Sequence, residues 1–163
     1  MTGVQTCALP IFKKLLDTGP DDGAALVEAA RALTFTGDLA GAKAYLDRAA
    51  DLDATPAARL ARERGRLALR HRDTKGALTA LEQSIAADER DFEAWLLLLD
   101  AELVAGDTAE AKRVNDEILR KFPDRRDSGL VTGRVALISG RTNDALTDFK
   151  SAKTALVNAP RRA

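Results

Sequence analysis

The chain has 163 residues, with 25 basic and 25 acidic side chains and 45% hydrophobic residues, a composition typical of one globular domain. A formal net charge of +0 excludes proteins that bind nucleic acid or anionic membranes mainly through their overall electrostatic field. No apolar run approaches the roughly 18 residues of a membrane span, and a single cysteine excludes an internal disulfide.

Residues 1–11, MTGVQTCALPI, lack the periodicity of the rest of the chain. This string resembles the translation of a common short-read sequencing adapter, so we expect it to be non-native and exclude it from the prediction of fold and function. Cys7 is excluded with it. The true N-terminus is then missing, which leaves the localisation open between the cytoplasm and a periplasmic or lipid-anchored site.

From residue 23 onward, the chain repeats with a period of about 34 residues. Turn positions recur at Gly37, Arg72, Gly106 and Gly140, and each is followed five residues later by an alanine, at Ala42, Ala77, Ala111 and Ala145. The pattern predicts four repeats, at 23–56, 58–91, 92–125 and 126–159.

Each repeat predicts two helices joined by a tight turn. In the third repeat the apolar spacing indicates helices at Phe92–Ala105 and Thr108–Lys121. Glycine at the turn supplies a left-handed backbone conformation, and the following Asp or Thr can cap the next helix. The recurring alanines are predicted to be close helix–helix contacts.

The repeat pattern resembles the tetratricopeptide repeat (TPR) family. The third repeat has Trp95, Gly106, Ala111 and Pro123 where that family has its typical residues, and the other repeats match in phase. The third repeat departs from the pattern with a large Leu99 and with Asn115. The resemblance implies an all-α fold, a right-handed α-solenoid of antiparallel helix pairs, and a role in protein–protein interaction.

The same resemblance assigns the ends of the chain. Residues 12–22 are interpreted as the remnant of a truncated repeat, and residues 160–163 as a tail. We therefore expect a fragment of a larger bacterial protein, and whether Ala163 is the natural C-terminus is left open.

The sequence offers few groups for catalysis, so we predict that the chain is not an enzyme. His71 is the only histidine and lies at the end of a charged helix, where a solvated position is expected. Without a second histidine or a native cysteine, the usual zinc and iron sites are excluded, and no cofactor is predicted.

The neutral total conceals two charged segments. Residues 57–75 contain seven basic and two acidic side chains, a net charge of +5, and residues 88–117 contain three basic and ten acidic ones, a net charge of −7. Two interpretations stay open: the charges bind a ligand, or they pair between adjacent helices, for example Arg66 with Asp100.

In the resembled family the first helix of each repeat lines a concave groove, which implies a set of candidate binding residues. They are Val27, Arg31 and Phe35 from the first repeat; Arg59, Arg62, Arg66 and Arg70 from the second; Glu93, Leu96, Asp100 and Leu103 from the third; and Asp127, Leu130, Arg134 and Leu137 from the fourth.

The leading hypothesis is a non-catalytic scaffold that binds a protein or peptide, with an acidic partner favoured by the arginines. Composition also resembles bacterial TPR lipoproteins of exopolysaccharide export and exosortase systems. The alternative is a regulatory or sensor region of a transcription regulator or glycosyltransferase. Nucleic acid is disfavoured, because no aromatic residues are interleaved with the arginines. The partner's identity and the oligomeric state are left open.

Overall fold

The computed structural model describes residues 22–125 and 128–157, which form eight helices, α2–α9, and contain no strand. The prediction of an all-α chain is confirmed. The adapter-like residues 1–11, the tail at 160–163 and all but Asp22 of the 12–22 remnant lie outside the described residues.

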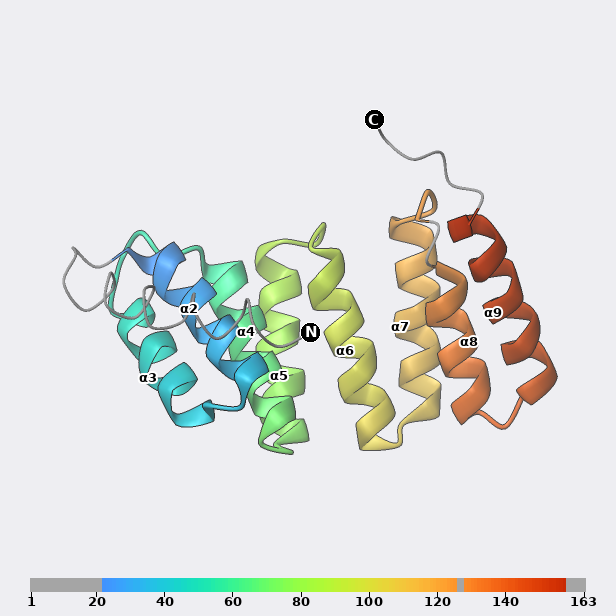
Figure 1. Cartoon of the computed structure of the whole chain (residues 1–163), viewed down its shortest axis with the longest axis horizontal. Coiled ribbons are helices and arrows are strands. Elements are labelled where there is room, and N and C mark those ends of the chain that lie inside the picture. Colours follow the sequence, from blue (N-terminus) through green and yellow to red (C-terminus); the bar gives the residue numbers. More distant parts are fainter. Residues whose placement is uncertain (1–21, 126–127, 158–163) are drawn as a thin grey trace. The chain divides into compact units, whose positions relative to one another are not determined.

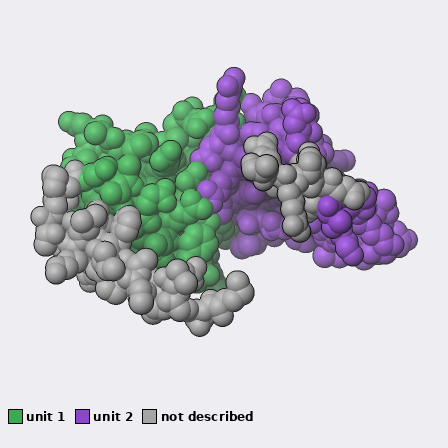
Figure 2. Space-filling view, turned by 45° about the horizontal axis from the view of Figure 1, so that its top comes forward, with its two compact units in different colours: residues 1–89 green, residues 90–163 purple. Residues whose placement is uncertain are grey.

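The chain divides into two compact units, residues 1–89 and residues 90–163, which are coloured separately in Figure 2. Unit 1 contains α2 (Gly23–Thr36), α3 (Leu39–Ala50), α4 (Ala57–Arg70) and α5 (Thr74–Ala87) (Figure 1). Helices α2 and α3 form one antiparallel pair, α4 and α5 form the next, and α4 also packs against both α2 and α3.

Unit 2 repeats this arrangement with α6 (Phe92–Ala105), α7 (Thr108–Lys121), α8 (Ser128–Ile138) and α9 (Thr142–Val157). Helix α8 packs against α9, α7 and α6. The bounds of α6 and α7 are those that the apolar spacing predicted. In each unit the two first helices, α2 with α4 and α6 with α8, are therefore neighbours.

The turns inside the helix pairs have the predicted geometry. Gly37, Gly106 and Gly140 have φ values of 91°, 80° and 76°, in the left-handed region that glycine adopts at low cost. In the first and third repeats the aspartate after the turn then caps the second helix: Asp38 accepts from the Gly41 amide and Asp107 from the Glu110 amide, both at 2.9 Å.

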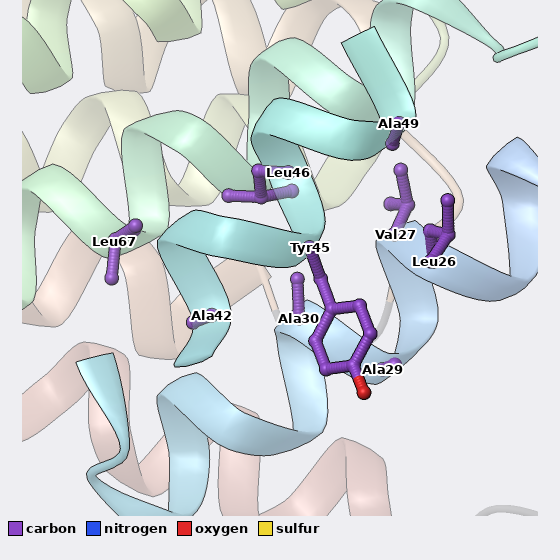
Figure 3. Close-up of a cluster of buried hydrophobic side chains, with 9 residues drawn as sticks. All are labelled: Leu26, Val27, Ala29, Ala30, Ala42, Tyr45, Leu46, Ala49 and Leu67. Atoms are coloured by element: carbon purple, nitrogen blue, oxygen red, sulfur yellow. The ribbon is translucent and has the colours of Figure 1, made fainter. Parts of the chain in front are cut away.

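The cores are built from small and aliphatic side chains at matching places in every repeat. The predicted contact alanines are all buried: Ala42, Ala77, Ala111 and Ala145. In unit 1, Ala42 belongs to a buried cluster that also contains Leu26 and Val27 of α2 and Tyr45, Leu46 and Ala49 of α3 (Figure 3). The methyl-sized side chains allow the helices to approach closely, as expected from the pattern.

Candidate protein-binding surface

In unit 1 an aromatic ring is displayed between two arginines. Phe35, near the end of α2, is 62% exposed. The guanidinium carbon of Arg31 lies 5.9 Å from the centre of its ring, and that of Arg66, on α4, lies 5.1 Å from it. Both distances are within the range of cation–π attraction, which orients the ring and the two side chains together.

A buried carboxylate, that of Glu63, fixes the position of Arg66. Glu63 is 1% exposed and accepts from Nε of Arg62 at 3.0 Å and from Nε of Arg66 at 2.8 Å. A buried carboxylate is tolerated only when it is paired in this way. We call Arg31, Phe35, Arg62, Glu63 and Arg66 the arginine–phenylalanine cluster.

The candidate binding residues of unit 1 that the repeat pattern implies differ in their exposure to solvent. Val27 is 1% exposed and belongs to the hydrophobic core, so its side chain is not available at the surface. Arg62 is 8% exposed and serves the ion pair with Glu63. Arg59 and Arg70 are exposed on α4, and Arg31 and Arg66 are partly exposed.

In unit 2 the first helices present mainly apolar side chains. Leu130 and Leu137 of α8 are exposed, and Leu96 and Leu103 of α6 are partly buried. Asp100 of α6 forms an ion pair with Arg134 of α8, and Glu93 is partly buried at the start of α6. Asp127 lies outside the described residues.

Several of the charged residues that the sequence singled out have partners within their own units. Arg66 donates to Glu63, and Arg134 donates to Asp100. Pairing between adjacent first helices therefore does occur, through Asp100 and Arg134. The pairing interpretation therefore holds for Asp100 and Arg134, and the binding of a ligand by the charged residues stays a prediction.

The structure adds two exposed apolar side chains that the sequence interpretation omitted. Val104 lies near the end of α6, as Phe35 lies near the end of α2, and it is 64% exposed. Ile138 lies at the end of α8 in the fourth repeat and is also exposed. The signal was present, because Phe35, Arg70, Val104 and Ile138 follow the same spacing as the turns.

Two carboxyl groups with shifted pKa values, among the residues that the structure describes, lie on α7. A hydrogen bond from Arg113 lowers the pKa of Glu110, and one from Arg120 lowers the pKa of Glu117. Both are pairs on successive turns of a solvated helix. Solvent screens such surface pairs, and they do not resemble a tuned catalytic acid or base.

His71 is exposed at the C-terminal end of α4. Within residues 22–125 and 128–157, no group of three or more His, Cys, Asp or Glu side chains is placed to hold a metal ion. No helix in that part of the chain has both the length and the apolar composition needed to cross a membrane.

Comparison with known proteins matches this geometry to one family. Two family models, both described as tetratricopeptide repeat, match residues 62–126 and residues 8–64. A comparison with curated proteins gives no match.

Solved structures with similar folds include TPR proteins. A thermophilic TPR protein of Thermus thermophilus has a TM-score of 0.80 and 19% identity, covering 98% of this chain and 85% of that one. A TPR protein of Parabacteroides merdae has a TM-score of 0.80 and 17% identity, covering 96% of this chain and 60% of that one. MamA of Desulfovibrio magneticus has a TM-score of 0.72 and 20% identity, covering 95% and 87%. At these identities the likeness shows the fold, and the predicted TPR solenoid is confirmed.

Proposed function

We propose that this chain, which belongs to the tetratricopeptide repeat family, is a non-catalytic scaffold that binds a protein partner through its first helices. The family typically binds proteins, and the displayed side chains of α2, α4, α6 and α8 support the same use here. Partners from exopolysaccharide export are the first natural candidates to test, because the composition resembles TPR lipoproteins of those systems.

The observation that carries the proposal is Phe35, an exposed ring held between the guanidinium groups of Arg31 and Arg66. Helices α2 and α4 together contain six arginines and two glutamates, a net charge of +4. An apolar contact surrounded by positive charge fits an acidic segment that also carries an apolar or aromatic side chain. The apolar contact would supply affinity, and the arginines would supply orientation and a faster association rate.

The test compares two fluorescein-labelled peptides of equal length, one rich in Glu with a single Phe, the other with every Glu replaced by Gln. We expect the acidic peptide to bind at least tenfold more tightly by fluorescence anisotropy. Arg31→Glu and Phe35→Ala should each weaken its binding by about five- to tenfold, the loss typical of an anchoring side chain. Arg62 and Arg66 are left intact because they hold the buried Glu63.

The matched control is Lys75→Glu, which makes the same charge change at an exposed position of α5. It should change the affinity by less than about twofold, since its effect is only long-range and screened. Equal affinity for the two peptides would reject the acidic partner. Equal loss in Lys75→Glu and Arg31→Glu would reject the cluster as the site of contact.

A further inference from the structure

The first helices of unit 2 carry the same side-chain pattern twice. Helix α6 has Leu96, Leu103 and Val104, and α8 has Leu130, Leu137 and Ile138 one repeat later, each residue 34 positions after its counterpart. The four side chains Val104, Leu130, Leu137 and Ile138 are between 39% and 64% exposed. Together with Asp100 and Arg134, we call these residues the leucine face.

Between the two apolar levels of the leucine face the equivalent residues have opposite charges. Asp100 of α6 accepts a hydrogen bond from Arg134 of α8, and both side chains remain partly exposed, at 37% and 46%. Leu96 and Leu130 lie one helical turn before the pair, and Leu103 and Leu137 about one turn after it. The face is therefore apolar, charged and apolar along both helices.

This pattern is self-complementary. A twofold axis that runs parallel to the helices in the plane of the contact places α6 of one copy opposite α8 of another. Each Asp100 then faces Arg134 of the second copy, while the leucine levels meet leucine levels. A closed contact in which one patch meets itself is the commonest form of association between identical chains.

From this complementarity we infer that the leucine face binds a second copy of this chain. The inference rests on the proposed function, in which α6 and α8 are part of the binding surface. It names a second copy of the chain as the molecule bound there. A partner segment of one charge would meet a like charge at either Asp100 or Arg134, which is costly at an interface. A second copy meets both with opposite charges in the required register.

Few side chains contribute, so the dimer belongs to the weak class of interfaces. We expect it in sedimentation velocity runs from roughly 10 µM to 1 mM, the range of weak association. Leu137→Gln replaces an exposed apolar side chain without breaking the ion pair, and it should weaken the dimer at least tenfold. The matched control Leu146→Gln, at an exposed position of α9, should leave it unchanged.

The decisive experiment exchanges the charges. Asp100→Arg gives a face with two arginines, and Arg134→Asp gives one with two aspartates, so each variant alone should be monomeric. An equimolar mixture of the two should form a heterodimer, and the double variant Asp100→Arg/Arg134→Asp should dimerise like the original chain. If Asp100 and Arg134 only stabilise the fold, mixing the two variants restores nothing.

The inference is overturned if the original chain stays monomeric up to about 1 mM, or if the mixture of folded single variants stays monomeric. Circular dichroism checks the folding of each variant. Should the single variants unfold, two other variants decide. Leu137→Gln must then weaken the dimer of the original chain, and the double variant Asp100→Arg/Arg134→Asp must keep it. A chain that is monomeric but binds the acidic peptide would overturn this inference alone, whereas a dimer without peptide binding would overturn the acidic-partner proposal alone.

Discussion

Arg72 occupies the turn position that glycine holds in the other three repeats. Its φ is 60°, in the left-handed region that side-chain-bearing residues adopt at a cost of about 1–2 kcal/mol. All four turns nevertheless close with the same bond, from the amide after the turn residue to a carbonyl five positions earlier, as in Asp73 to Ala68. The second repeat therefore keeps the family geometry with a strained backbone.

Replacing Arg72 by glycine should relieve this strain. We expect Arg72→Gly to raise the free energy of unfolding by about 0.5–1 kcal/mol, since the gain in the turn exceeds the added freedom of glycine in the unfolded chain. The reverse change, Gly37→Arg, should lower it by about 1 kcal/mol. Urea denaturation followed by circular dichroism measures both, and a loss of stability in Arg72→Gly would contradict the prediction.

In the second and fourth repeats, a small residue on the first helix makes room for a large one on the second. A methyl group added at Gly65 would lie 2.5 Å from Cγ of Leu81, and one at Gly133 would lie 2.5 Å from the Phe149 ring. The third repeat has Leu99 on its first helix and Asn115 on its second, both buried. In this repeat the larger side chain lies on the first helix instead of the second. Among the residues that the structure describes, the buried Asn115 Oδ1 has no hydrogen-bond partner, which is costly.

This packing predicts a coupled pair in the second repeat. Gly65→Ala should lower the free energy of unfolding by about 1–3 kcal/mol, because the added methyl group overpacks against Leu81. Leu81→Ala alone should cost about 2–5 kcal/mol through the cavity that it leaves. The double variant should lose at least about 1 kcal/mol less than the sum, as contacting residues do in a double-mutant cycle. Strict additivity in denaturation would show that the two residues do not compete for space.

The all-α repeat fold was predictable from the sequence, because the turn residues and the contact alanines recur with the period. The bounds of α6 and α7 and the burial of Ala42, Ala77, Ala111 and Ala145 follow from it. The surface was less predictable. Val27 and Arg62 are buried because side chains of neighbouring helices pack against them. The position of a residue within its repeat does not specify those neighbouring side chains.

Because each repeat is stabilised mainly by its neighbours, a local defect should stay local. In the Gly65→Ala variant we expect amide hydrogen exchange to accelerate by at least tenfold in α4 and α5 and by less than about twofold in α8 and α9. Exchange measured by mass spectrometry on peptides from both units tests this. An equal acceleration along the entire described chain would show that the array unfolds as one cooperative body.

The pairing of Glu63 with two arginines also bears on the thermodynamics of ligand binding. Long side chains usually lose rotational freedom when a ligand immobilises them, at about 0.5–1.5 kcal/mol each. Arg62 and Arg66 are already restrained by the carboxylate of Glu63 in the folded chain. Most of their entropy is therefore lost on folding, and a ligand that contacts Arg66 meets a guanidinium group whose orientation is already fixed.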